Sequence, residues 1–332
     1  MKIVWMPLEP LEARYTKDWA KWYPKEFQNA GQRYITVEGK SLTDSINIGS
    51  VLDAYGTNYY KMTQMAELIY LIQDGQVTGD DVLLFADLWY PGIEALQYIK
   101  NLGGTCPKIT GVLHAGTWDD NDFTVRSGMR PWGHPLEEAW FQIYDLIFVG
   151  TNYHRNLITN YHRVNPDKII VTGLPFYTPE VRRVVKEDNV ILFPHRLDPE
   201  KNLDEYCKAV AGLSVKSFRT AQVCQNKEQY YQLLSQGTIA VSTADQETFG
   251  YAMLEAESLG CIPIVPRKAC YPEMYDERLT YNSFQDLNGL LKKVLENLLD
   301  YRSIAEDSRV FHQKLYNRSI SRIITSILNK VV

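Results

Sequence analysis

Short apolar runs that alternate with helical segments constrain the fold more than any other feature of this sequence. "DVLLFADLW" at 81–89 and "KIIVTGLP" at 168–175 are continuous apolar stretches, whereas "MTQMAELIYLIQDG" at 62–75 has the helical period and ends at a glycine. Strands that are buried on both faces and joined through helices belong to parallel sheets. The sequence therefore predicts an α/β protein with mainly parallel sheets.

The alternation starts again near residue 190, and this predicts a second lobe. The 332 residues exceed what one core usually supports. "NVILFPHRLDPEKN" opens a new strand, loop and helix after an expected linker at 176–188, and "FRTAQVC" at 218–224 is expected to be a strand. We expect three parts: a first domain over 1–176, a second domain over 177–310, and a C-terminal helix over 311–332 that packs back on the first domain.

Composition narrows the class of protein. A hydrophobic content of 45% and a charged content of 23% are those of a folded globular chain. The net charge of −5 argues against a surface that binds nucleic acid as a whole, although a local basic patch stays possible. The five cysteines form no C-x2-C pair, and the amino-terminal apolar run is too short for a signal peptide or a membrane span. We expect a cytoplasmic protein.

Polar residues follow several of the expected strands. In open parallel sheets, ligands bind beyond the carboxyl ends of the strands, where the strand order reverses. The residues at such ends are Asp87, His114, Arg196, Lys201 and Glu247. Arg196 and Lys201, in "HRLDPEKN", can converge on a diphosphate, since both stay protonated. The alternative is an exposed loop that happens to carry two basic residues.

The segment "STADQETFGYAMLEA" adds a second constellation. Thr248, Phe249 and Gly250 are expected to open a helix, whose first backbone N–H groups form an anion site. Glu247 and Glu255, with seven residues between them, can accept hydrogen bonds from a sugar and from the vicinal hydroxyls of a ribose. The alternative is that Glu247 only complements the helix dipole and that Glu255 is solvated.

These segments, together with "CYPEMYD", resemble the nucleotide-sugar half of retaining glycosyltransferases with the two-lobed GT-B fold, in the large family that carries two such glutamates. The resemblance is specific over about 190–276 and architectural elsewhere. It implies that 177–310 is the nucleotide-sugar-binding domain and that 1–176 is the acceptor-side domain. It implies that Arg196, Lys201 and the backbone around Phe249 and Gly250 bind the donor diphosphate. It also implies that Glu247 contacts the donor sugar and that Glu255 binds the ribose.

The resemblance further implies retaining sugar transfer from a nucleoside diphosphate, with UDP favoured and with neither a metal ion nor a cofactor. His114 in "VLHAG" matches a histidine that commonly lines this site, so the expected catalytic residues are His114, Glu247, Arg196 and Lys201. Asp119 and Asp120 are expected to belong to a loop or to the acceptor side. We expect the remaining first-lobe histidines to be structural or exposed; they are His134, His154 and His162.

The sequence also departs from the family pattern. "VCQNKEQ" stands where a glycine-rich turn is usual, so we expect Asn226 and Lys227 to contact the base. The first loop, "MPLEPLEARYT", lacks the usual glycines, which leaves the acceptor side undefined. There we expect Arg14 and Asp87, with Trp89 and Trp118 as platforms on which a sugar or a base can stack.

The opening segment and "DLWYPG" are similar to bacteriophage glycosyltransferases, some of which modify hydroxymethylated DNA bases. An acceptor in DNA requires only a local patch, and the host cytoplasm is then the location. The expected patch comprises Arg14, Lys17, Lys21, Lys25, Arg126 and Arg130. A glycan or a small molecule is the other possible acceptor. A GT-B epimerase and a non-catalytic nucleotide-sugar-binding protein stay open as alternatives, and the sequence predicts no oligomeric state.

Overall fold

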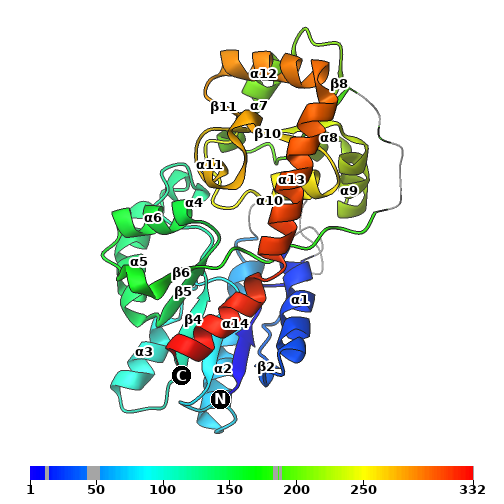
Figure 1. Ribbon diagram of the computed structural model, residues 1–332. Helices are drawn as coiled ribbons and strands as arrows, with labels where there is room; N and C mark the ends of the chain where they lie inside the picture. Colours follow the sequence, from blue (N-terminus) through cyan, green and yellow to red (C-terminus); the bar gives the residue numbers. More distant parts are fainter. Residues whose placement is uncertain (12–14, 43–52, 182–185, 187–188, 332) are drawn as a thin grey trace. The chain divides into compact units, whose positions relative to one another are not determined.

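The computed structural model describes residues 1–11, 15–42, 53–181, 186 and 189–331 (Figure 1). The chain forms two compact units, Met1–Pro175 together with Arg318–Val332, and Phe176–Asn317. The second unit thus begins where the predicted linker begins. The chain returns to the first unit at Arg318, seven residues after the expected start of the final helix.

The first unit contains a six-stranded parallel sheet with the strand order β2-β1-β3-β4-β5-β6. Its strands are β1 (Ile3–Met6), β2 (Tyr34–Thr36), β3 (Val82–Phe85), β4 (Lys108–Val112), β5 (Leu146–Val149) and β6 (Ile169–Val171). Every residue of β1, β3 and β5 is buried, because helices cover both faces of the sheet. This confirms the predicted parallel α/β class for the first unit.

Helices of the first unit follow the strands in the expected alternation. They are α1 (Tyr15–Asn29), α2 (Gly56–Gln73), α3 (Glu94–Asn101), α4 (Phe123–Arg126), α5 (Arg130–Ile143), α6 (Asn152–Tyr161), the 3-10 turn η1 (Pro166–Lys168) and α14 (Ser319–Lys330). α14, drawn in red, contacts α1 (Figure 1). It buries four isoleucines at helical spacing, namely Ile320, Ile323, Ile324 and Ile327.

The second unit contains a five-stranded parallel sheet with the strand order β11-β10-β9-β7-β8. Its strands are β7 (Val190–Phe193), β8 (Lys216–Arg219), β9 (Ile239–Val241), β10 (Ile262–Pro266) and β11 (Thr280–Tyr281). Its helices are η2 (Pro199–Lys201), α7 (Leu203–Val210), α8 (Thr220–Val223), α9 (Lys227–Gln236), α10 (Tyr251–Ser258), α11 (Tyr271–Met274), η3 (Glu277–Leu279), α12 (Phe284–Glu296) and α13 (Leu298–Tyr316).

One predicted strand of this unit is wrong in extent. "FRTAQVC" supplies only Phe218 and Arg219 to β8, and Thr220 starts the short helix α8. The buried Thr220 hydroxyl donates to the carbonyl of Phe193 in this turn.

Among the described residues, no helix combines the length and the apolar character that a membrane crossing requires.

Candidate functional site

The polar residues of the second unit lie where the order of its sheet reverses. β8 and β9 flank β7 on opposite sides, so the connections that leave β7 and β9 run in opposite directions and open a crevice between them. His195 and Arg196 follow β7, and Glu247 follows β9. The predicted position of Arg196 and Glu247 in the loops after strands is therefore confirmed.

Lys201 and Glu247 form an ion pair at this point. The Lys201 ammonium donates to Glu247 Oε1 at 2.9 Å and to the Gln246 carbonyl at 2.7 Å. Lys201 is only 5% exposed, so the pair is largely shielded from water. Burial alone would raise the pKa of Glu247, but the adjacent Lys201 ammonium holds it below its ordinary value. Glu247 is therefore a charged acceptor.

Backbone contacts tie the two loops of the pair together. The Thr243 hydroxyl donates to the carbonyls of Lys201 and Asn202 at 2.7 and 2.9 Å. Asn202 has a left-handed backbone (φ 52°), which asparagine tolerates better than most residues, and its side-chain amide donates to the Thr243 carbonyl at 3.1 Å. The positions of Lys201 and Glu247 are therefore fixed before any ligand binds.

His195 belongs to the same group and was not among the predicted site residues. Its Nδ1 lies 3.7 Å from Glu247 Oε1, and the residue is 3% exposed. Burial lowers the pKa of His195 to about 3, against the opposing effect of Glu247, so the imidazole is neutral. A signal was present in the sequence, because a histidine directly after a buried strand was the criterion that selected His114.

Arg196 is the accessible cation of this group. Its side chain is 46% exposed, and its guanidinium lies 3.1 Å from Asp198 and 4.0 Å from Glu200. A half-exposed ion pair contributes little stability and is readily exchanged. Arg196 can therefore reorient toward an incoming anion at small cost.

The helix α10 starts later than predicted. The helix begins at Tyr251, so Thr248 and Phe249 precede it and Gly250 is its N-cap, with φ 74°. A Cβ at Gly250 would lie 3.0 Å from Cε1 of Tyr271, so glycine suits both the backbone angle and the space. The Phe249 ring is buried against Tyr251 and Tyr316, which leaves only its backbone for a ligand.

Glu255 lies within α10 and accepts two tyrosine hydroxyls. Tyr230 donates to its Oε2 at 3.0 Å, and Tyr231 donates to its Oε1 at 2.9 Å. Both tyrosines come from α9. Because each carboxylate oxygen has two lone pairs, these bonds orient Glu255 and still leave acceptor capacity for a diol.

Asn226 and Lys227, the residues expected to contact the base, begin α9. Asn226 is the N-cap and accepts a hydrogen bond from the backbone of Gln229 at 2.9 Å. The ammonium of Lys227 lies 5.4 Å from the centre of the Tyr231 ring. Both residues thus have a local structural role, and α9 brings them close to the two tyrosines that hold Glu255.

In the first unit, His114 follows β4 as predicted. Its Nε2 lies 2.8 Å from the Ala86 carbonyl, which can only accept, so Nε2 carries the proton. Nδ1 then faces the Tyr15 hydroxyl at 3.4 Å, and the rings of Tyr15 and Trp19 pack on the imidazole. Burial lowers the pKa of His114 despite the nearby Asp87, so this imidazole is neutral as well.

Asp87 and Trp89 both lie in the loop that follows β3. Asp87 accepts from the backbone of Trp89 at 3.0 Å and from the Lys61 ammonium at 3.4 Å. The Trp89 indole donates to Glu137 at 2.8 Å and makes edge contacts with Trp132 and Trp140. Both side chains therefore brace this loop, and Trp89 is only partly buried.

The acceptor-side prediction for Trp118 is wrong. The residue is 1% exposed, and its ring packs on Phe141, His154 and His162 in the core of the first unit. No ring face is left on which a sugar could stack. Arg14 lies outside the described residues.

Lys17, Lys21 and Lys25 of the expected basic patch are spaced by four residues on α1, and so lie on one face of that helix. Arg126, at the end of α4, is exposed. Arg130 is committed elsewhere, because it donates to the Thr117 carbonyl at 2.9 Å and to Asp120. Asp119 and Asp120 lie in the loop between β4 and α4, as expected.

Known proteins resemble this chain in sequence over a short segment and in fold over its whole length. No family model matches this chain. A segment of 68 residues, 20% of the chain, is 48% identical to tRNA-queuosine alpha-mannosyltransferase of Drosophila melanogaster. The chain spans 17% of the length of that relative.

Solved structures match over nearly the whole chain. Sucrose-phosphate synthase from Thermosynechococcus elongatus gives a TM-score of 0.75 at 10% identity, with 100% of this chain and 99% of that chain covered. Anabaena HepE in complex with UDP gives 0.63 at 10% identity, with 99% of each chain covered. WaaG, a glycosyltransferase involved in lipopolysaccharide biosynthesis, gives 0.62 at 13% identity, with 98% and 99% covered. The protein therefore has the GT-B fold of these glycosyltransferases, as its sequence predicts.

Proposed function

We propose that this protein is a glycosyltransferase that moves a sugar from a nucleoside diphosphate, preferably UDP, to an acceptor hydroxyl. The observation that carries this proposal is the Lys201–Glu247 pair, which lies beside Arg196 and the glycine-capped start of α10 at the switch point of the second sheet. A site with two cations and one fixed carboxylate suits a ligand that combines a diphosphate with a polyol. The UDP complex of HepE, which shares the fold, supports the choice of nucleotide.

Each residue then has a role. The Lys201 ammonium directs two of its three N–H bonds to Gln246 and Glu247, and the third serves a donor phosphate. Arg196 leaves its surface ion pairs to bind the same diphosphate, together with the backbone at Thr248 and Gly250. Glu247 accepts from the donor sugar. Glu255 accepts from the ribose, and Asn226 and Lys227 lie toward the base.

The reaction breaks the bond between the anomeric carbon and the diphosphate oxygen and forms a bond to the acceptor oxygen. We place the acceptor on the face from which the diphosphate leaves, so that its proton passes to the departing phosphate oxygen and the configuration is retained. The charge that develops on the diphosphate is stabilised by Lys201, Arg196 and the start of α10. These cations suffice without a metal ion, so added Mg²⁺ or Mn²⁺ should leave the turnover unchanged.

For the acceptor we propose a hydroxyl on a modified base of a nucleic acid. The 68-residue match to a tRNA-queuosine alpha-mannosyltransferase favours this class. Lys17, Lys21 and Lys25 on α1 supply positive charge to the first unit of a chain whose net charge is negative. A hydroxymethylated DNA base of the phage type belongs to the same class and shares the same chemistry.

The first test is a thermal shift of the purified chain against UDP, GDP, ADP and their sugars. A ligand that binds only the native state raises the melting temperature. A selective shift with one nucleotide would support the donor site, and we expect it with UDP. If none of these nucleotides shifts a folded sample, the donor-site assignment is wrong.

The second test is product analysis with the donor that the first test selects. The enzyme is incubated with tRNA, with hydroxymethylated DNA, and with glycan and small-molecule acceptors. The nucleic acids are then digested to nucleosides, and the masses of all products are measured by mass spectrometry. We expect a mass increase of one sugar on a nucleoside, with the anomeric configuration of the donor. Conversion of the donor sugar to its epimer without any acceptor would instead establish an epimerase, and binding without any product would establish a non-catalytic protein.

A further inference from the structure

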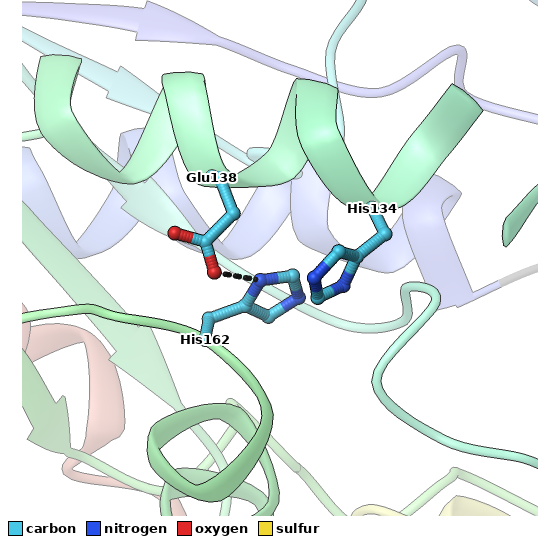
Figure 2. A group of neighbouring side chains, drawn as sticks. All are labelled: His134, Glu138 and His162. Atoms are coloured by element: carbon cyan, nitrogen blue, oxygen red, sulfur yellow. Dashed lines mark hydrogen bonds and ion pairs between the residues drawn. The ribbon is translucent and has the colours of Figure 1, made fainter. Parts of the chain in front are cut away.

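A histidine and a glutamate of α5 converge on a third side chain at the end of α6. His134 and Glu138 are four residues apart, so they lie on the same face of α5. His162 is the C-cap of α6. Figure 2 shows both α5 side chains directed toward the His162 ring, and one ligand atom from each of the three residues lies within 4.8 Å of the others.

His162 has a carboxylate beside each ring nitrogen. Glu138 Oε1 lies 2.9 Å from Nδ1, and Glu137 Oε2 lies 3.0 Å from Nε2 in a contact too bent for a good hydrogen bond. A neutral imidazole has one N–H and one lone pair. One ring nitrogen therefore faces a carboxylate oxygen with its lone pair, and a metal ion bound beside it would offset the repulsion.

His134 offers a second nitrogen ligand. Its ring stacks on that of His162, with centroids 4.5 Å apart and an interplanar angle of 22°. A metal ion bound at His162 would gain this imidazole as a neighbour. Two imidazoles and one carboxylate form the ligand set of known zinc sites that keep a fourth position for water.

Glu137 supplies the outer support that such sites require. It is 1% exposed, and its Oε1 accepts from the Trp89 indole and from the Thr117 backbone, each at 2.8 Å. A small rotation of the His162 ring would let Nε2–H donate to Glu137, as a metal-bound histidine donates to an outer carboxylate, and the other nitrogen could then bind a metal ion. Here that other nitrogen is Nδ1, on the side of Glu138.

The cluster is also within reach of solvent. The side chain of Glu138 is 29% exposed and His134 is half-buried, whereas the side chain of His162 is fully buried. Ligands of one tetrahedral zinc ion lie about 3.3 Å apart when the bonds are about 2.0–2.1 Å long. The His134 ring, which stacks on His162 and meets Tyr161 edge-on, therefore has to rotate toward the other two residues when a metal ion binds.

We propose that His134, Glu138 and His162 form a binding site for a divalent transition-metal ion of the zinc type. Bound metal would join α5 to the end of α6 and, through Glu137, to the loops that follow β3 and β4. The sugar transfer proposed above takes no step through this site, and bound metal would stabilise the first unit whether or not the transferase proposal holds.

The test uses the full chain, stripped of metal with a chelator and then titrated with Co²⁺. We expect one equivalent to bind with visible d–d absorption, Zn²⁺ to displace it, and Zn²⁺ to raise the melting temperature by several degrees. His134→Asn and Glu138→Gln change the two more accessible ligands, and each should weaken Co²⁺ binding at least about tenfold. Glu296→Gln, at an exposed position of α12, is the matched control and should bind as the parent does.

Two results would overturn the proposal. One is Co²⁺ binding that His134→Asn and Glu138→Gln leave unchanged, which would place the metal on the cysteines or elsewhere. The other is the absence of any change in the NMR signals of the His134 and His162 rings when Zn²⁺ is added. In that case the three side chains form a hydrogen-bonded cluster without a metal ion.

Discussion

The loops that follow the strands carry charged side chains in the second unit and mainly aromatic and neutral side chains around His114 in the first. In the second unit they carry opposite charges, with Lys201 shielded from water beside Glu247 and Arg196 nearby. In the first unit, neutral His114 packs on the rings of Tyr15 and Trp19. Charge fixed in a dry site selects a charged ligand, whereas rings and a neutral imidazole suit an uncharged one. On the function proposed above, the diphosphate would bind at the second unit and an uncharged acceptor at the first.

The sharpest way to break this comparison is to remove one charge from the second unit. Lys201→Ala should lower kcat/KM for transfer by about 10³-fold, because it removes stabilisation of the leaving diphosphate. Lys208→Ala, on the exposed side of α7, is the control and should be nearly neutral. Steady-state kinetics with the selected donor measures both variants.

His114→Ala should cost less, about tenfold, because a neutral imidazole contributes less to charge stabilisation than an ammonium. A larger loss for His114→Ala than for Lys201→Ala would reverse the assignment of the two units. Near-normal activity of Lys201→Ala in a folded sample would remove the diphosphate role altogether.

The next effect is a dependence of stability on pH. The pKa of His195 is about 3 in the folded chain, against about 6.5 when unfolded. Between these values the unfolded chain binds a proton that the native chain does not, so stability falls as the pH falls below 6.5. At pH 5 this loss should reach about 2 kcal/mol relative to pH 7.

His195→Asn isolates this contribution from that of other titrating groups. The difference in the free energy of unfolding between the parent and His195→Asn should shrink by about 2 kcal/mol from pH 7 to pH 5. Urea unfolding at each pH measures it. Parallel pH profiles for the two proteins would mean that His195 is not neutral and buried in solution.

A third test compares two glycines with almost the same backbone angle. Gly250 has φ 74° and Gly212 has φ 76°, but only at Gly250 would a Cβ meet a neighbour, Cε1 of Tyr271 at 3.0 Å. Gly212→Ala should cost about 1 kcal/mol for the left-handed backbone alone. Gly250→Ala should cost about 2 kcal/mol, since the crowding adds to this, and it should also weaken nucleotide binding.

Equal losses of unfolding free energy in the two variants would show that Tyr271 yields freely. Unchanged nucleotide affinity in Gly250→Ala would argue that the start of α10 does not touch the phosphates.

The smallest expected effect concerns the orientation of Glu255. Tyr231→Phe removes the hydroxyl that donates to Glu255 Oε1, so UDP affinity should fall by roughly threefold, corresponding to less than about 1 kcal/mol. Calorimetric titration measures it, and Tyr98→Phe, at an exposed tyrosine, is the control. Unchanged affinity would place the ribose away from this carboxylate.

Much of the fold and of the second-unit site could be predicted from the sequence, for a local reason. A buried strand that ends in polar residues is visible as a continuous apolar run, and Arg196 and Glu247 stand in the loops that follow such runs. Parallel strands then bring residues at their carboxyl ends to one edge of the sheet. No long-range information is needed for that step.

Other features depend on packing that the sequence does not display. Whether the ring of Trp118 turns into the core or toward solvent is decided by α5 and α6, which pack around it. His134 and His162 are 28 positions apart, and only the packing of their helices joins them. The role of the Tyr230 and Tyr231 hydroxyls likewise appears only once α9 lies against α10.

The helix α14 has a consequence for how the chain can be made. Residues 318–331 belong to the unit that holds residues 1–175, and four isoleucines bury there. During translation, all of the second unit therefore leaves the ribosome before α14 is made. The first unit begins to be synthesised first but is completed last. Until then the apolar surface that awaits α14 is open, which makes a nascent or truncated chain the form most exposed to chaperones and proteases.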